Sequence, residues 1–293
     1  MKTTIPDELK NELPPSKWGK LLAATPIVMT VIATMLAGLA SSEMTHAQYD
    51  RSLAAQLQSK AGDQWNYYQA KKLRSAVSHN TLDLLGATTD IQPLGDSSLG
   101  ELDSATKTAL AKGELPSVAA AKLDDAVVTA ITAVENSRPE SEIDVTLAKI
   151  SDATLASNLN IATQNALDFD AAIKSINKTL DKLDETLFNG DKTVFRNFTA
   201  SRLRFTANRY DTEARLNQNV AGIYELQVRK SNISAERRHQ RSGKFFYGML
   251  AAQMGVIIST FAMAARQKSV LWSVAAAAGL AAVSFAGYVY FCV

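Results

Sequence analysis

Long runs without charged side chains dominate the hydrophobic pattern of this chain. Residues 21–42, 245–265 and 269–293 contain no Asp, Glu, Lys or Arg. At ~1.5 Å rise per residue, a helix of about 20 such residues crosses the ~30 Å hydrocarbon core of a bilayer. We therefore predict transmembrane helices at residues 18–42, 245–265 and 269–293, preceded by a short N-terminal tail over residues 1–17. The last two form a hairpin around a charged turn at residues 266–268.

Small residues recur four positions apart in the second and third predicted spans. In lipid, this spacing lets helix backbones approach closely and pack through dispersion contacts. Gln253 is the one strongly polar side chain in its span, so we expect it to face another helix. The pairs of small residues are Gly248 with Ala252, Gly255 with Ser259, and Ala275 with Gly279.

Two helical stems are predicted between the first and second spans. The ascending stem, residues 43–85, has no proline and carries a one-sided apolar stripe that continues from the first span. The descending stem, residues 191–244, carries apolar positions three and four apart and leads into the second span. The ascending stripe consists of Leu53, Leu57, Ala61, Trp65, Leu73 and Val77.

An acidic insert, residues 86–190, separates the stems. Glycine and proline break its first part into short pieces. One amphipathic helix follows, marked by Leu123, Val127, Ala130 and Val134 and ended near Pro139. Acidic residues outnumber basic ones in the insert, whereas the stems are basic. This partition predicts a helical cap that carries negative charge on basic stems.

The second part of the insert has the most regular pattern in the chain. Between residues 155 and 187 apolar residues alternate at spacings of four and three, which is typical of a coiled-coil seam. The seam must bury against something, either residues 191–228 folding back after the Asn189–Gly190 turn or the same helix of another copy. The large seam residues are Leu155, Leu159, Phe169, Ile173, Ile176, Leu180, Leu183 and Leu187.

The composition offers little material for catalysis. The net charge is +2, so no positive surplus indicates a nucleic-acid partner. One cysteine and three scattered histidines give no spacing typical of a metal site, and no phosphate-binding loop or nucleophile elbow occurs. We therefore predict no enzyme activity, no cofactor, no bound metal and no small-molecule substrate.

Basic residues gather just before the second predicted span. Arg237, Arg238, Arg241 and Lys244 lie next to it and are predicted to contact anionic lipid headgroups. Positive charges on the two sides of the membrane are balanced. Because short segments decide orientation more than long domains, we expect a cytoplasmic N-terminus and a periplasmic region 43–244.

An aromatic motif lies on the ascending stem. The run Trp65-Asn66-Tyr67-Tyr68-Gln69-Ala70-Lys71 resembles the signature of an uncharacterised bacterial membrane-protein family, domain of unknown function 4337. The resemblance covers residues 18–82 and 195–290, and includes Arg209-Tyr210 and Glu213-Ala214 on the returning helix. It implies a protein of the bacterial inner membrane with three spans and a helical soluble part, and it implies no activity.

Two interpretations of this motif stay open. In the first, the motif forms a recognition surface for another protein, since interfaces favour large, rigid aromatic side chains. The residues of this surface are Trp65, Tyr67, Tyr68 and Lys71. In the second, Trp65 and Tyr68 pack as knobs between the two stems.

The sequence as a whole predicts an all-α membrane protein with three transmembrane helices, a long helical stem with a coiled coil, and a helical cap. Its expected role is a scaffold or accessory subunit that assembles with itself or with other membrane proteins, and the alternative is a component of an oligomeric channel or transport complex.

Overall fold

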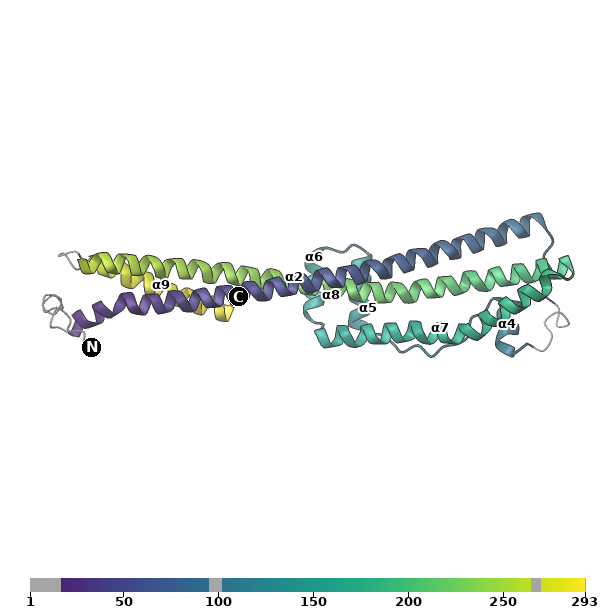
Figure 1. The fold of residues 1–293 in the computed structure, drawn as a ribbon, viewed down its shortest axis with the longest axis horizontal. Helices are drawn as coiled ribbons and strands as arrows, with labels where there is room; N and C mark the ends of the chain where they lie inside the picture. Colours follow the sequence, from purple (N-terminus) through teal and green to yellow (C-terminus); the bar gives the residue numbers. More distant parts are fainter. Residues whose placement is uncertain (1–16, 95–101, 265–269, 293) are drawn as a thin grey trace, which may run out of the picture. The chain divides into compact units, whose positions relative to one another are not determined.

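The described part of the chain is built from α-helices and loops. The computed structural model describes residues 17–94, 102–264 and 270–292, and no strand occurs in these ranges. The all-α prediction is therefore confirmed, whereas the predicted tail and the charged turn at residues 266–268 lie outside the described residues. The helices are α2 (Lys17–Thr88), α4 (Ser104–Lys112), α5 (Asp125–Glu135), α6 (Glu140–Ala148), α7 (Asp152–Phe188), α8 (Lys192–Ala264) and α9 (Val270–Cys292) (Figure 1).

The chain divides into two compact units. Unit 1 contains residues Met1–Leu53 and Ser231–Val293, and unit 2 contains residues Ala54–Lys230. The long helices α2 and α8 each contribute to both units, because each is a single continuous helix. Each unit has its own set of buried contacts.

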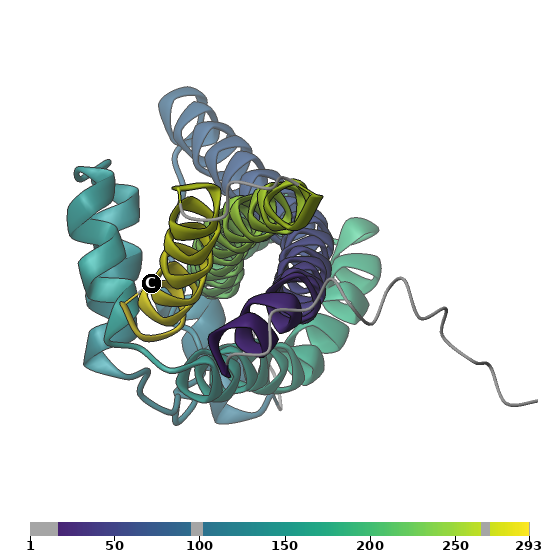
Figure 2. The same cartoon turned by 90° about the vertical axis from the view of Figure 1, so that its left-hand side faces the viewer.

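In unit 1, the first part of α2, the last part of α8 and α9 lie side by side (Figures 1 and 2). One cluster of small side chains joins Ala33 of α2, Ala252 of α8 and Ala282 of α9. A second cluster contains larger residues, Leu36 of α2 and Phe245 of α8. A Cβ added at Gly279 would lie 2.0 Å from Cε of Met29. Glycine at position 279 thus leaves the space that the methionine of α2 occupies.

The predicted small-residue pairs all lie inside unit 1. Many large apolar side chains lie on the outside of the unit, exposed in the structure. The buried pairs are Gly248 with Ala252, Gly255 with Ser259, and Ala275 with Gly279. The exposed large side chains include Ile27, Val31, Met35, Leu250, Ile257, Phe261 and Leu280.

Among the described residues, two helices are long and apolar enough to cross a membrane. These are α2 and α8, each over part of its length. Helix α9 contributes a shorter apolar stretch, Ser273–Phe285, to the side chains that the structure describes. The structure thus supports two membrane-crossing helices, and the third span stays a prediction.

In unit 2, α7 and the beginning of α8 pack against each other. Helix α7 ends at Phe188, the chain turns through Asn189 and Gly190, and α8 begins at Lys192. Ile176 and Leu180 of α7 share one hydrophobic cluster with Phe198 and Phe205 of α8 and with two residues of α4. The seam therefore closes within the chain. Of the predicted seam residues, Leu155, Phe169, Ile173, Ile176 and Leu180 are buried, and Leu159, Leu183 and Leu187 are half-buried.

The predicted apolar stripe of the ascending stem is right in its first half and wrong in its second. Ala61 is buried and Trp65 half-buried, but Leu73 and Val77 are 66% and 54% exposed. Ser75 takes the inner position, and its hydroxyl donates a hydrogen bond to the carbonyl oxygen of Ala207 on α8, 3.1 Å away. Polar pairing with α8 decides which face of α2 turns inward here.

The short helix predicted near residues 123–134 is α5. Its first turn is capped by Asp124, whose carboxylate accepts a hydrogen bond from the backbone N–H of Ala126. Val127 and Ala130 are fully buried in unit 2. A Cβ added at Gly222 of α8 would lie 3.0 Å from Ile131, so this glycine allows α5 to approach α8 closely.

Candidate functional site

The residues of the aromatic motif point in different directions on α2. The rings of Trp65 and Tyr68 meet edge to face, with centroids 5.4 Å apart and planes at 87°, and both side chains are half-buried. Tyr67 is 57% exposed. The structure therefore places Trp65 and Tyr68 as a mutual packing pair, and leaves Tyr67 as the motif aromatic that a partner can reach.

Lys71 of the motif points into unit 2. Its ammonium group pairs with the carboxylate of Glu213 on α8, whose side chain is only 7% exposed. The other oxygen of this carboxylate lies 3.2 Å from Nε of Arg209, one helical turn earlier on α8. One buried carboxylate thus holds two cations from two helices, which compensates its removal from water.

A tyrosine ring lies beside these cations. The guanidinium carbon of Arg209 is 4.4 Å from the centroid of the Tyr210 ring, Nζ of Lys71 is 5.3 Å away, and the guanidinium carbon of Arg74 is 5.7 Å away. Cations at this distance from an aromatic face are attracted by its quadrupole. The motif side of α2 is therefore joined to α8 by one carboxylate and one ring.

Helix α7 completes this cluster. One guanidinium N–H of Arg209 donates a 2.8 Å hydrogen bond to Oδ1 of Asn177 on α7. The pKa of Asp170, also on α7, is raised because partial burial disfavours its charged form and because Glu213 adds a second negative charge nearby; Lys71 and Arg209 oppose the rise. The arrangement locks three helices together. In the described residues, no group of three His, Cys, Asp or Glu side chains is placed to hold a metal ion.

Sequence reasoning missed Glu213 and Tyr210 as the partners of the motif. Both belong to the stretch of the descending stem that carries the family resemblance, but the pattern does not show which ascending residue they meet. The available signal was the spacing of Arg209 and Glu213, a basic and an acidic residue four positions apart on one helix face.

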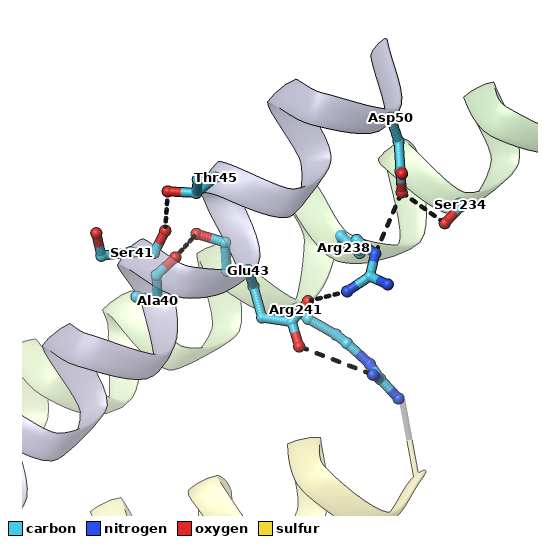
Figure 3. Close-up of polar contacts among 9 residues, drawn as sticks. Ala40, Ser41, Glu43, Thr45, Asp50, Ser234, Arg238 and Arg241 are labelled. Carbon is cyan, nitrogen blue, oxygen red and sulfur yellow. Dashed lines mark hydrogen bonds and ion pairs between the residues drawn. The ribbon is translucent and has the colours of Figure 1, made fainter. Parts of the chain in front are cut away.

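A second polar cluster lies in unit 1, directly after the uncharged run of α2 (Figure 3). The guanidinium group of Arg238 lies between two carboxylates of α2, 3.2 Å from Asp50 and 3.5 Å from Glu43. The hydroxyl of Ser234 donates a 2.7 Å hydrogen bond to the same oxygen of Asp50. Arg241 lies 3.9 Å from the other oxygen of Glu43.

This cluster changes the interpretation of the basic residues before the second predicted span. Arg238 and Arg241 have acidic partners on α2, so their charges are compensated within the chain. Arg237 is exposed and Lys244 half-buried, and neither forms an ion pair with another described residue. Of the four cations predicted to contact lipid, two are thus paired, and two have no acidic partner among the residues that the structure describes.

Gln253 of α8 is exposed, contrary to the expectation that a neighbouring helix covers it. Its amide makes no hydrogen bond to any side chain or backbone group in the described ranges. The helix face that it shares with Leu250 and Ile257 points away from the contacts with α2 and α9.

Comparison with known proteins supports the family resemblance. Residues 18–114 match the family described as Domain of unknown function (DUF4337). The resemblance to this family is thereby confirmed over these residues, which include the aromatic motif and reach past the ascending stem into the insert. No curated protein and no solved structure matches the chain.

Proposed function

We propose that this protein is a non-catalytic membrane scaffold or accessory subunit, which assembles with itself or with other membrane proteins through its helical stem and cap. The observation that carries the proposal is where small and large apolar side chains lie in unit 1. Alanine, glycine and serine recur in the contacts between its helices, beside a few larger buried residues such as Leu36 and Phe245, and many large apolar side chains lie on its outside. Lipid favours both features, because helices in a bilayer associate through close backbone packing and present apolar surface to the hydrocarbon.

The proposal places three helices in the membrane, with α9 as the third. Helix α9 has 23 residues and contains no charged side chain. It packs on the apolar parts of α2 and α8 through Ala282, so a position in water would leave the rest of its apolar surface exposed. The proposed site is the bacterial inner membrane, with the N-terminus in the cytoplasm and residues 43–244 in the periplasm.

The polar cluster of unit 1 fits the level of the lipid headgroups. Glu43 and Asp50 follow the uncharged run of α2, and Arg238 and Arg241 precede that of α8. Ion pairs at this level compensate one another, which leaves Arg237 and Lys244 for contact with anionic lipids. The proposed lipid contact therefore depends on these two residues rather than on all four.

Contact with a partner protein is proposed at the exposed aromatic of the motif. Tyr67 offers a large, rigid ring with a hydroxyl, and these properties are enriched at protein interfaces. The helix that carries Tyr67 is held in place by Lys71 and Glu213, so the ring is presented on an ordered surface. We further propose that α7 and the first part of α8 form an antiparallel coiled coil that stiffens the cap.

Affinity purification of the full chain from its native membrane in mild detergent tests the scaffold proposal. We expect a fixed partner protein to co-purify, and Tyr67→Ala to reduce its recovery at least fivefold. Tyr49→Ala is the matched control, because Tyr49 lies on the same helix and is 67% exposed, and it should leave recovery unchanged. A chain that purifies alone under all conditions, or equal losses from both variants, would contradict the proposed contact.

A second candidate function rests on Gln253. A polar amide exposed on an apolar helix would line a water path if several copies surrounded it, as in an oligomeric channel or transport complex. Ion flux through vesicles that contain the purified protein tests this candidate. Flux that falls with Gln253→Leu but not with the neighbouring control Met254→Leu would support it, and vesicles that stay closed to ions would exclude it.

A further inference from the structure

The outward face of α2 in unit 2 carries an apolar pattern that nothing in the described part of the chain covers. Six positions, five apolar and one an asparagine, follow one another at spacings of three and four, and all six are exposed. They are Ala70, Leu73, Val77, Asn80, Leu84 and Ala87, defined here as the outer seam. A helix with this spacing presents one continuous edge, and heptad spacing is the pattern by which two helices supercoil.

The exposure of the three large residues of the outer seam follows from the packing of the opposite face of α2. Leu73, Val77 and Leu84 are 66%, 54% and 65% exposed, although the opposite face of the same helix is held against α8 by Ser75 and Lys71. The inner face therefore fixes the rotation of α2, and α2 cannot bury the outer seam by turning about its axis. Burial of the outer seam therefore needs a partner from outside the described residues.

The residues of the outer seam fit a second copy of this chain. In heptad notation Ala70, Val77 and Leu84 take the a positions, and Leu73, Asn80 and Ala87 take the d positions. One adjacent pair, Val77 at a and Leu73 at d, has the combination of a β-branched residue and leucine that favours two parallel strands. An amide in the seam can both donate and accept a hydrogen bond, so Asn80 can pair with its own equivalent across a two-fold axis and fix the register.

The flanks of the outer seam also permit self-association. In a parallel pair, residues at g meet residues at e of the next heptad on the partner helix. For this seam the pairs are Gln69 with Arg74, Ala76 with Thr81, and Asp83 with Thr88. None joins two like charges, so no repulsion along the flanks opposes the pairing.

We propose that the outer seam of α2 is a homodimer interface, in which the α2 helices of two copies pair in parallel and in register. This inference rests on the proposed membrane location, because two copies inserted with the same orientation carry equivalent segments away from the bilayer in the same direction. It goes further than the proposed scaffold role by naming the surface, the partner and the orientation. Tyr67 lies beside the outer seam and remains available to a different partner.

Site-specific disulfide cross-linking in native membranes tests the interface. Cys292 is the only cysteine of the chain, so Cys292→Ser provides a cysteine-free background. Val77→Cys and Leu73→Cys in this background should each form a disulfide with the same residue of a second copy, giving a species of twice the 31.6 kDa chain mass. Leu167→Cys on α7 is the matched control, because it is an apolar residue 56% exposed in the same unit, and it should stay largely uncross-linked.

Three outcomes would overturn the proposal. These are no dimer from either seam cysteine, equal cross-linking of the Leu167→Cys control, and an adduct whose mass is not that of two chains, which would mean that another protein covers the seam. A second measurement avoids dependence on cysteine chemistry. Val77→Lys should shift the protein in mild detergent from dimer to monomer, whereas Val145→Lys, at a site 61% exposed elsewhere in unit 2, should not.

Failure of the dimer and failure of the scaffold proposal can be told apart. Loss of seam cross-linking together with retained, Tyr67-dependent recovery of a partner protein would remove the homodimer alone. Release of the chain from membranes by alkaline carbonate would instead remove the membrane location on which both proposals depend.

Discussion

Lys71 of α2 and Glu213 of α8 form an ion pair inside unit 2, across 142 positions of the sequence. The carboxylate is shared with Arg209, and the pair lies beside the ring of Tyr210. Lys71 belongs to the motif by which the chain resembles the DUF4337 family. The motif lysine thus has a structural role in joining the two stems, and the neighbouring Tyr67 is left outside that role.

Loss of the Glu213 carboxylate should weaken unit 2. Glu213→Leu leaves Lys71 and Arg209 without their shared partner, and we expect a loss of about 2–4 kcal/mol in the free energy of unfolding, since the pair is largely buried. Trp65 fluorescence can report the unfolding of unit 2 in the full chain when Trp18 and Trp272 are replaced by Phe. Denaturant titration of this variant in detergent gives the measurement.

The matched control for Glu213→Leu is Asp211→Asn. Asp211 pairs with Lys72 on the same two helices, but both side chains are well exposed, at 39% and 47%. An exposed pair contributes about 0–1 kcal/mol, so this variant should stay close to the wild type. Equal losses from the two variants would show that the burial of Glu213 has no importance.

The Asp170 carboxylate should destabilise unit 2 at neutral pH, compared with a neutral residue at the same position. Its pKa is raised in the folded protein by burial and by the charge of Glu213, so the folded state binds its proton more tightly than the unfolded state does. Stability contributed by this group is present below the unfolded pKa of about 3.9 and is lost as pH rises through the folded pKa. Asp170→Asn should therefore raise the free energy of unfolding at pH 7 and lose this advantage near pH 3.5.

Asp103 provides the opposite case for the same pH titration. Hydrogen bonds from the hydroxyl and the backbone N–H of Thr106 lower its pKa, so its stabilising contribution is present at pH 7 and is lost as pH falls below the unfolded value. Asp103→Ala should cost about 1 kcal/mol at pH 7, as for other N-cap residues, and less in acid. If both aspartate variants shift stability in the same direction at pH 7, the assignment of the two environments is wrong.

Gly113 should tolerate no side chain. It ends α4 with φ of +70°, and an added Cβ would lie 2.8 Å from Cγ of Arg204. Gly113→Ala should therefore lower the free energy of unfolding by about 1–2 kcal/mol through backbone strain and overlap. Gly62→Ala in α2 is the control, because nothing lies within 4 Å of its added Cβ. That variant should be neutral or stabilise the helix by about 0.5–1 kcal/mol, in the same chemical denaturation experiment.

Gly279 should contribute to the close packing of α9 on α2 in unit 1. A side chain there meets Met29, so Gly279→Leu should separate α9 from α2 and lower the melting temperature in detergent, with a cost of about 1–3 kcal/mol typical of overpacking. Gly287→Leu on the same helix adds the same side chain where nothing lies within 4 Å. The account is contradicted if Gly287→Leu melts as early as Gly279→Leu.

The sequence predicts those features of the fold that depend on spacing alone. The residues from Leu155 to Leu187 show where α7 buries its surface, because a faultless three-and-four spacing has one inner face. The choice between a partner in the same chain and a partner in another copy is not contained in that spacing. It depends on the turn at Asn189 and Gly190 and on Phe198 and Phe205, which give α7 its neighbours.

The same logic explains why the second half of the predicted apolar stripe is wrong. Leu73 and Val77 were assigned to the inner stripe because apolar residues usually face the interior, yet Ser75 and Lys71 find hydrogen-bonding and charged partners on α8 and turn that face inward. Lipid contact by Arg238 and Arg241 stays a prediction, and their ion pairs with Glu43 and Asp50 are a feature that their position next to the span does not indicate. Pairing between polar residues distant in sequence is decided in three dimensions, and single-helix patterns do not show it.

The most direct test of the central claim is the mass of the native particle in lipid. Native mass spectrometry of the chain in nanodiscs formed straight from its membrane should give a species that contains at least two copies of the 31.6 kDa polypeptide, or one copy with a fixed partner. A single chain alone in every disc would contradict a scaffold role. Recovery of the chain in the soluble fraction, with no disc at all, would contradict the membrane location as well.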